Sequence, residues 1–207
     1  ICLHERAIGA TLMLVEQQQA QMPCLADVAR AIDEPHERLQ SAFADERALM
    51  VASLEQALVY LMDASTRAVV QVDPNDPVAQ FTALADAYLE WAVSHGPQFR
   101  LISYNNVVDC NKEPSLRRYI DAITDLMGRM LARARDQGHL DPADSIPLMV
   151  LSSRNYVYGL AHQILNGRLQ GWPAGDPLAN AKLLVRDMIM RMARGSRPSG
   201  SGTGVTE

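Results

Sequence analysis

The sequence predicts an all-α protein, and three observations support that fold class. Apolar residues recur at helical spacing, as at Ile8, Leu12 and Val15. The periodic segments are separated by short stretches rich in proline, glycine and aspartate, which are typical of helix boundaries. No segment shows the strict alternation of apolar and polar residues that indicates a strand, and the sequence has no internal repeat.

We expect four helices in the N-terminal third of the chain. The first spans Arg6–Gln19, and the second spans Leu25–Ile32 and ends at an Asp-Glu-Pro sequence. Proline suits the first turn of the next helix, Pro35–Phe43, because its missing N–H would have no partner there anyway. Asp45 is a typical N-cap residue, and we expect it to open a long helix that ends near Val70.

Similar signals bound the remaining helices. The pattern breaks at the Asp-Pro-Asn-Asp-Pro stretch of 73–77 and again at 95–97, and 105–114 is polar enough for a loop. A strongly periodic segment stops at Gly138, a residue type that commonly follows a helix C-terminus. The helices expected from these boundaries are Val78–Ser94, Gln98–Tyr104, Ser115–Gln137, a helix opened by Asp144 or Ser145 that runs to Leu169, and one from Asp176 to Arg194.

The composition bounds the class of protein. The chain has 207 residues, of which 48% are hydrophobic, and this content suffices for a buried core. We expect no signal peptide and no membrane span, because no stretch approaches about 18 consecutive apolar residues. Cys2, Cys24 and Cys110 lie far apart, which argues against a disulfide framework or a metal site and favours a reducing cytoplasm.

Charge is distributed unevenly along the chain. Residues 1–60 contain four basic and nine acidic side chains, so this segment carries the whole net charge of −5. A module that binds duplex DNA usually has the opposite sign, because neutralising phosphates supplies much of its affinity. The charge therefore weighs against nucleic-acid binding, and a basic arm ahead of Ile1 would offset it.

One pattern of small and apolar residues runs through the first fifty residues. It comprises Ala10–Val15 in the first helix, Val28 and Ala29 in the second, Leu39 and Phe43 in the third, and Leu49 in the fourth. Leu39 and Phe43 stand four residues apart, so they share one face of their helix and are expected to point into a small core. The opposite face of that helix is then free to enter a major groove.

The order and spacing of these residues resemble the DNA-binding domain of the TetR family of bacterial transcriptional regulators. The segment 87–96 with 99–101, and Tyr158–Ala161 followed by Gly167, are similar to later motifs of the same family. The resemblance implies an N-terminal three-helix helix-turn-helix domain over 1–48 and a helical ligand-binding and dimerisation domain over 49–195. The Gly/Ser-rich residues 196–207 are expected to form a disordered tail.

The sequence departs from the family pattern at several positions in the DNA-binding domain. The phosphate-contacting lysine, tyrosine and histidine usual in the family are replaced, as are the turn glycine, the serine N-cap and the threonine before the second helix. The residues that stand there are Glu46, Gln40, Ala42, Asp33, Pro35 and Cys24, respectively. The groups that clamp the DNA backbone and set its register are therefore largely missing.

The resemblance places the DNA-contacting residues on the third helix. The arginine and the glutamine on its outer face suit guanine and adenine edges, respectively. The predicted DNA-binding residues are His36, Glu37, Arg38, Gln40 and Ser41.

We expect no enzymatic activity, no cofactor and no metal site. The five histidines are scattered, and none stands near cysteines or carboxylates at metal-ligand spacing. Ser152 and Ser153 lack the glycines of a nucleophile elbow, and no glycine-rich phosphate loop is present.

The resemblance also implies a ligand cavity among the later helices. Methionine and aromatic side chains are expected to line it, because they adapt to apolar ligands, with a few polar contacts from one helical face. We expect a cavity between the helices that carry Trp91, Tyr104, Met127 and Tyr158. Arg154 is expected to form an ion pair, with contact to an acidic ligand as the alternative. The predicted ligand-binding residues are Trp91, Phe99, Ile102, Tyr104, Met127, Met130, Asn155, Tyr158 and His162.

The last two helices carry more apolar residues than one subunit needs to bury. In the family these helices pair with their symmetry mates, and Gly159 would permit a close helix approach. The predicted dimer residues are Leu148, Leu151, Gly159, Ile164, Leu184 and Met188.

The function implied by the resemblance is that of a cytoplasmic homodimeric repressor, released from operator DNA by a small apolar or amphipathic effector. Two alternatives remain open. The acidic N-terminal segment favours a TetR-like dimer that has lost duplex binding and acts as a ligand sensor or a protein-binding module. The other alternative is a purely structural helical dimer.

Overall fold

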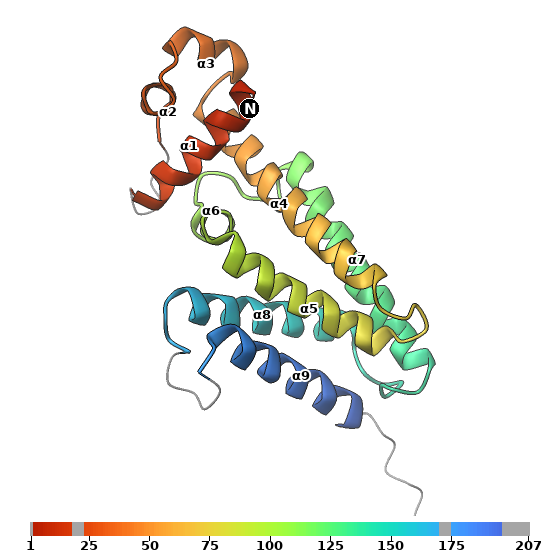
Figure 1. Ribbon diagram of the computed structural model, residues 1–207. Helices are drawn as coiled ribbons and strands as arrows, with labels where there is room; N and C mark the ends of the chain where they lie inside the picture. Colours follow the sequence, from red (N-terminus) through yellow and green to blue (C-terminus); the bar gives the residue numbers. More distant parts are fainter. Residues whose placement is uncertain (1, 18–22, 170–174, 196–207) are drawn as a thin grey trace, which may run out of the picture. The chain divides into compact units, whose positions relative to one another are not determined.

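The computed structural model describes residues 2–17, 23–169 and 175–195 (Figure 1). Within these ranges the chain forms nine helices and no strand, which confirms the predicted all-α fold class. The expected tail at 196–207 lies outside the described residues.

The helices fall into two compact units, one formed by Ile1–Thr66 with Glu90–Ile123 and the other by Arg67–Leu89 with Thr124–Glu207. The predicted domain boundary between residues 48 and 49 falls in the first turn of a long helix, and it stays a prediction. The first unit holds α1 (Leu3–Gln17), α2 (Leu25–Ala31), α3 (His36–Ala42), α6 (Gly96–Tyr104), most of α4 (Glu46–Val70) and the start of α7 (Pro114–Asp136). The second holds most of α5 (Pro77–Ser94), the rest of α7, α8 (Ile146–Leu165) and α9 (Pro177–Gly195).

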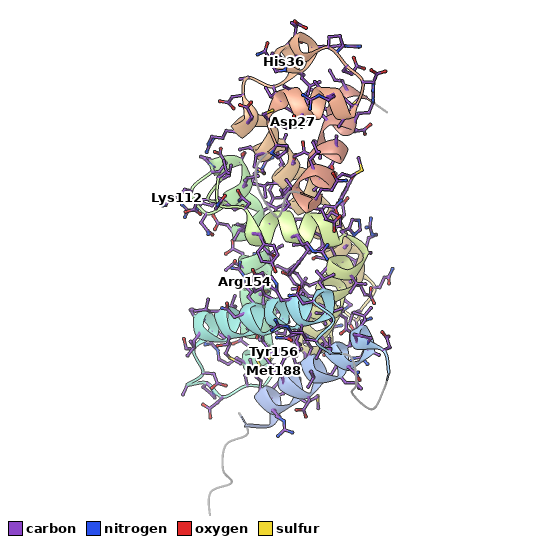
Figure 2. The ribbon with its side chains drawn as sticks, turned by 90° about the vertical axis from the view of Figure 1, so that its left-hand side faces the viewer. Asp27, His36, Lys112, Arg154, Tyr156 and Met188 are labelled. Carbon is purple, nitrogen blue, oxygen red and sulfur yellow. The ribbon has the colours of Figure 1, made fainter. Side chains whose placement is uncertain are left out.

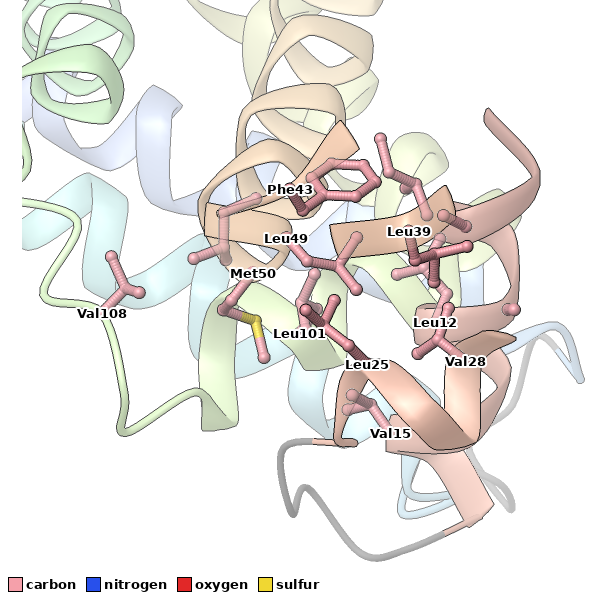
Figure 3. Packing of buried hydrophobic residues seen from close by; sticks show 14 of the residues in the cluster. Leu12, Val15, Leu25, Val28, Leu39, Phe43, Leu49, Met50, Leu101 and Val108 are labelled. Atoms are coloured by element: carbon pink, nitrogen blue, oxygen red, sulfur yellow. The ribbon is translucent and has the colours of Figure 1, made fainter. Parts of the chain in front are cut away.

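The core of the first unit is built where α1 packs against α2 and α6, and α2 against α3. Leu12, Val28 and Leu39 come from three different helices and lie together in this core (Figure 3). Leu39 is 0% exposed and Phe43 is 4% exposed, as their spacing predicted. Burial of this apolar side fixes which side of α3 faces outward.

Carboxylate caps define several helix starts. Asp45 Oδ1 accepts a hydrogen bond from the backbone N–H of Ala48 at 2.7 Å, which confirms the predicted N-cap of α4. Asp176 accepts backbone hydrogen bonds at the start of α9, from Leu178 at 3.1 Å and Ala179 at 3.3 Å. These caps satisfy N–H groups that have no partner within the helix.

The turn between α2 and α3 has a left-handed residue. Asp33 has a φ of 53°, which explains why the family pattern has glycine there, although aspartate is among the residues that tolerate this region. Pro35 is the N-cap residue of α3 and not its first helical residue, because the helix begins at His36. The φ of Pro35, −59°, already suits the turn that leads into the helix.

Two predicted helix boundaries, the start of α1 and the end of α8, were wrong by a few residues. α1 begins at Leu3 rather than Arg6, and α8 ends at Leu165 rather than Leu169. Gly167 has a φ of 66°, so the chain leaves the helical conformation just after α8.

The second unit is organised around the packing of α8 against α9 (Figure 1). Val157 and Ala161 of α8 and Val185 of α9 are buried in it. Arg186 Nη2 of α9 pairs with Asp86 Oδ2 of α5 at 2.7 Å. This contact ties α5 to the same unit.

Candidate nucleic-acid interface and ligand site

The outer face of α3 is the candidate nucleic-acid interface. Because Leu39 is buried, the side chains of Glu37, Arg38, Gln40 and Ser41 are exposed. His36 is half-buried, and its Nδ1 atom has no hydrogen-bond partner among the described residues, so it is the least accessible of the five predicted contacts. This placement is what a groove-reading helix requires.

Arg38, the cation predicted to read a base, is held by a carboxylate of its own chain. Its Nη1 atom lies 2.8 Å from Glu34 Oε2. Glu34 Oε1 lies 2.6 Å from Arg6 Nη1, and Arg6 also donates to the carbonyl of Ile32. The hydrogen bond from Arg6, followed by the charge of Arg38, holds the pKa of Glu34 below its ordinary value. Glu34 therefore stays ionised at neutral pH, and Arg38 must leave it to reach a base.

Glu46 contacts the N-terminus of α2. Its Oε1 atom accepts a hydrogen bond from the backbone N–H of Leu25 at 3.2 Å. The N-terminal end of a helix carries partial positive charge and favours an anion. Glu46 therefore supplies negative charge where the family pattern has a phosphate-contacting lysine. The sequence showed that Glu46 replaces this lysine, but it could not show the contact with Leu25.

All lysines and arginines of the first unit are described residues. Each of them pairs with a carboxylate. The unit has eight such cations against fourteen aspartates and glutamates, a net charge of −6. No cation of this unit is left over to neutralise a phosphate without breaking an ion pair. The pairs are Arg6–Glu34, Arg30–Asp27, Arg38–Glu34, Arg47–Glu113, Arg100–Glu16, Lys112–Asp109, Arg117–Asp121 and Arg118–Glu55.

Four of the predicted ligand-binding residues belong to the first unit. Trp91 and Phe99 are buried, with ring centroids 6.4 Å apart in an edge-to-face arrangement. Ile102 is half-buried, whereas Tyr104 is 46% exposed. Trp91 and Phe99 thus form an aromatic core, and their contact with a ligand stays a prediction.

The other five predicted ligand-binding residues belong to the second unit. Met127 and Met130 are buried on α7, and Asn155 and Tyr158 are exposed on α8. The ring of Tyr158 meets the ring of His162 edge-to-face, with centroids 4.5 Å apart. Because the predicted cavity draws on residues of both units, it also stays a prediction.

Sequence reasoning missed two polar residues of the second unit, Tyr88 on α5 and Thr124 on α7. Burial, and then the neighbouring Tyr158, raise the pKa of Tyr88, and the charge of Arg154 offsets part of that rise. Arg154 Nη1 donates to Thr124 Oγ1 at 3.0 Å. Figure 2 shows Arg154 on α8. We expect an ion pair for Arg154 from the sequence, but the partner of its side chain among the described residues is the hydroxyl of Thr124.

The six predicted dimer residues differ in exposure. Leu148 and Leu151 of α8 are 61% and 57% exposed, which is high for leucine. Gly159 is also exposed, and a side chain at its position would meet open space. Ile164, Leu184 and Met188 are half-buried. The chain alone therefore leaves apolar surface on α8 uncovered.

No group of three or more histidine, cysteine or acidic side chains among the described residues is placed to hold a metal ion. No described helix is long and apolar enough to cross a membrane.

Part of the chain matches a known protein family. Residues 81–188 match the family description of the tetracyclin repressor-like C-terminal domain. No curated protein matches the sequence significantly.

Solved structures with a similar fold cover nearly the whole chain. A protein of unknown function from Rhodococcus sp. RHA1 has a TM-score of 0.77 at 23% identity, covering 96% of this chain and 97% of its own. A TetR-like transcriptional regulator from the same organism has a TM-score of 0.70 at 12% identity, with coverages of 92% and 95%. A putative TetR-family transcriptional regulator from Syntrophomonas wolfei has a TM-score of 0.72 at 11% identity, with coverages of 93% and 95%.

Proposed function

We propose a function from one established premise: the chain belongs to the TetR family of transcriptional regulators. On that premise, it is a homodimeric repressor that binds operator DNA through α3 and is released by a small effector. The observation that carries the proposal is the burial of Leu39 and Phe43, which turns the polar face of α3 outward. Membership of a family of regulators also supports the expectation that the chain is not an enzyme.

Base reading is assigned to Arg38 and Gln40. Both are exposed on α3, and their donor and acceptor groups suit guanine and adenine edges. Each bidentate contact contributes about 1–3 kcal/mol of discrimination between bases. Because Arg38 must first leave Glu34, its net contribution belongs at the lower end of that range.

Replacing Arg38 by alanine is expected to weaken binding to a selected duplex about tenfold and to relax the preference for one base pair per half-site. Fluorescence anisotropy with a labelled duplex measures the affinity. Arg117→Ala is the matched control, because Arg117 is an exposed, ion-paired arginine of the same unit on α7. Equal affinity of wild type and Arg38→Ala would remove α3 from the assignment.

Effector release follows from the geometry of a dimer on DNA. Half-sites one helical turn apart, about 34 Å, require one fixed separation of the two recognition helices. An effector that binds a conformation with a different separation of the recognition helices competes with DNA, because the two ligands favour different conformations. The coupling free energy expected for such a regulator is about 1–3 kcal/mol.

The proposed dimer interface uses α8 and α9, where Leu148 and Leu151 leave apolar surface exposed. We expect the wild-type protein to sediment as a dimer at micromolar concentration, by isologous contact of these faces. The double variant Leu148→Glu, Leu151→Glu should sediment as a monomer. Val70→Glu is the control, because Val70 is a 72% exposed apolar residue outside α8 and α9. A monomeric wild type would refute the proposed interface.

The ion pairing of the first unit favours a second candidate, a TetR-like dimer that senses a ligand or binds a protein without binding duplex DNA. All cations of that unit pair internally, and Glu46 places negative charge at the start of α2. Absence of duplex binding at every salt concentration, together with retained ligand binding, would make this candidate the better one.

A further inference from the structure

We infer that the second unit binds an amphipathic carboxylate, with Arg154 pairing with its head group. The inference rests on the proposed ligand-sensing function and adds the chemical class of the effector. It involves α5, α7 and α8 of the second unit only.

Arg154 is a positioned arginine without an acidic partner. Its Nη1 atom donates to Thr124 Oγ1 at 3.0 Å, and no described carboxylate lies within 4.0 Å of the guanidinium group. Two arginines of the unit, Arg186 and Arg191, pair with Asp86 and Asp187 at 2.7 Å each, whereas the exposed Arg154, like Arg133, has a neutral side-chain partner. A guanidinium has five N–H donors in a planar fork, so Arg154 keeps donors that match a carboxylate.

The charge of Arg154 acts on a neighbouring tyrosine of the same unit. Tyr88 is a half-buried residue of α5, and the charge of Arg154 acts on its phenol. Tyr158, one helical turn from Arg154 on α8, also acts on Tyr88 and packs against His162. Burial lowers the pKa of His162, so its imidazole is neutral at pH 7 and adds polarity without charge. An anion beside Arg154 would meet its positive charge, and the phenol of Tyr88, whose pKa is raised, stays neutral at pH 7.

The apolar body of the ligand is assigned to α7. Met127 stands three residues after Thr124, so the two side chains project from the same side of the helix. Met127 and Met130 are 7% and 2% exposed, and methionine adapts its shape to apolar groups. A polar end at Arg154 and Thr124, followed by adaptable apolar side chains, suits a carboxylate on an apolar chain.

The test is calorimetric titration of the full-length protein with straight-chain carboxylates from hexanoate to hexadecanoate, each beside the alcohol of the same length. We expect the carboxylate to bind about tenfold to a hundredfold more tightly than its alcohol, as for a hydrogen bond to a charged group. Arg154→Gln should abolish this preference and leave alcohol binding unchanged. Arg154→Lys should restore part of it, because lysine keeps the charge without the planar fork. Arg129→Gln, which changes an exposed arginine of α7, should keep the wild-type preference.

Several outcomes would overturn the inference. Equal binding of carboxylates and alcohols, an unchanged preference in Arg154→Gln, or no binding of either series to the folded wild type would each refute it. Circular dichroism confirms that the variants are folded. DNA is absent from these titrations, so an Arg154-dependent preference supports the site even if the protein binds no duplex. Conversely, DNA binding without any such preference would retain the repressor proposal and remove this one.

Discussion

Replacing Glu46 by lysine is expected to strengthen duplex binding about tenfold at low salt and to make it more sensitive to salt. The wild-type carboxylate accepts the N–H of Leu25 at the start of α2 and repels a phosphate at that place. Lysine removes the repulsion, frees the N–H and adds a cation. One new phosphate contact per subunit should steepen the log–log salt slope by about 0.9, or about twice that for a dimer.

The measurement is a set of anisotropy titrations across salt concentrations, with wild type, Glu46→Lys and Glu46→Gln. Glutamine removes the charge but keeps an oxygen for the N–H of Leu25, so it should raise affinity without steepening the slope. The wild type itself should have a shallow slope, because the cations of the first unit are already paired. A steep wild-type slope, or equal slopes for all three proteins, would contradict this explanation.

Leu39→Ala is expected to cost about 2–5 kcal/mol in the free energy of unfolding. Leu39 is 0% exposed at the point where α1, α2 and α3 meet, so alanine leaves a cavity that this small core cannot readily close. The loss should also abolish duplex binding, because the buried side of α3 sets the direction of its outer face.

Urea unfolding followed by circular dichroism measures the effect. Met13→Ala is the matched control, since Met13 is an apolar residue of α1 that is 58% exposed, and its change should stay within about 0.5 kcal/mol. A cost below about 1 kcal/mol for Leu39→Ala would show that α3 is not held by this core.

The sequence predicted the helices and the core well, because both depend on local patterns. Asp45 and Asp176 cap their helices through N–H groups two or three residues away, and Gly138 has the left-handed φ of 77° typical after a helix. The periodicity of Leu39 and Phe43 similarly predicted their burial. The C-terminal end of α8 was predicted too late because apolar spacing continues past Leu165 while the backbone turns at Gly167.

The polar contacts of the candidate sites could not be predicted, because they join residues far apart in the sequence. Arg47 and Glu113 are 66 residues apart, and their pairing depends on the tertiary fold. The contact between Arg154 and Thr124 likewise spans 30 residues. The sequence showed that the N-terminal segment is acidic, whereas only the structure shows that its cations are occupied.

Selection of bound sequences from random duplex DNA by the full-length protein tests the central claim most directly. The proposed function predicts enrichment of a palindromic sequence with half-site centres about 34 Å apart, and loss of that enrichment in Arg38→Ala. No enriched sequence at low salt, with a folded dimeric protein, would contradict the claim that this chain is a DNA-binding repressor.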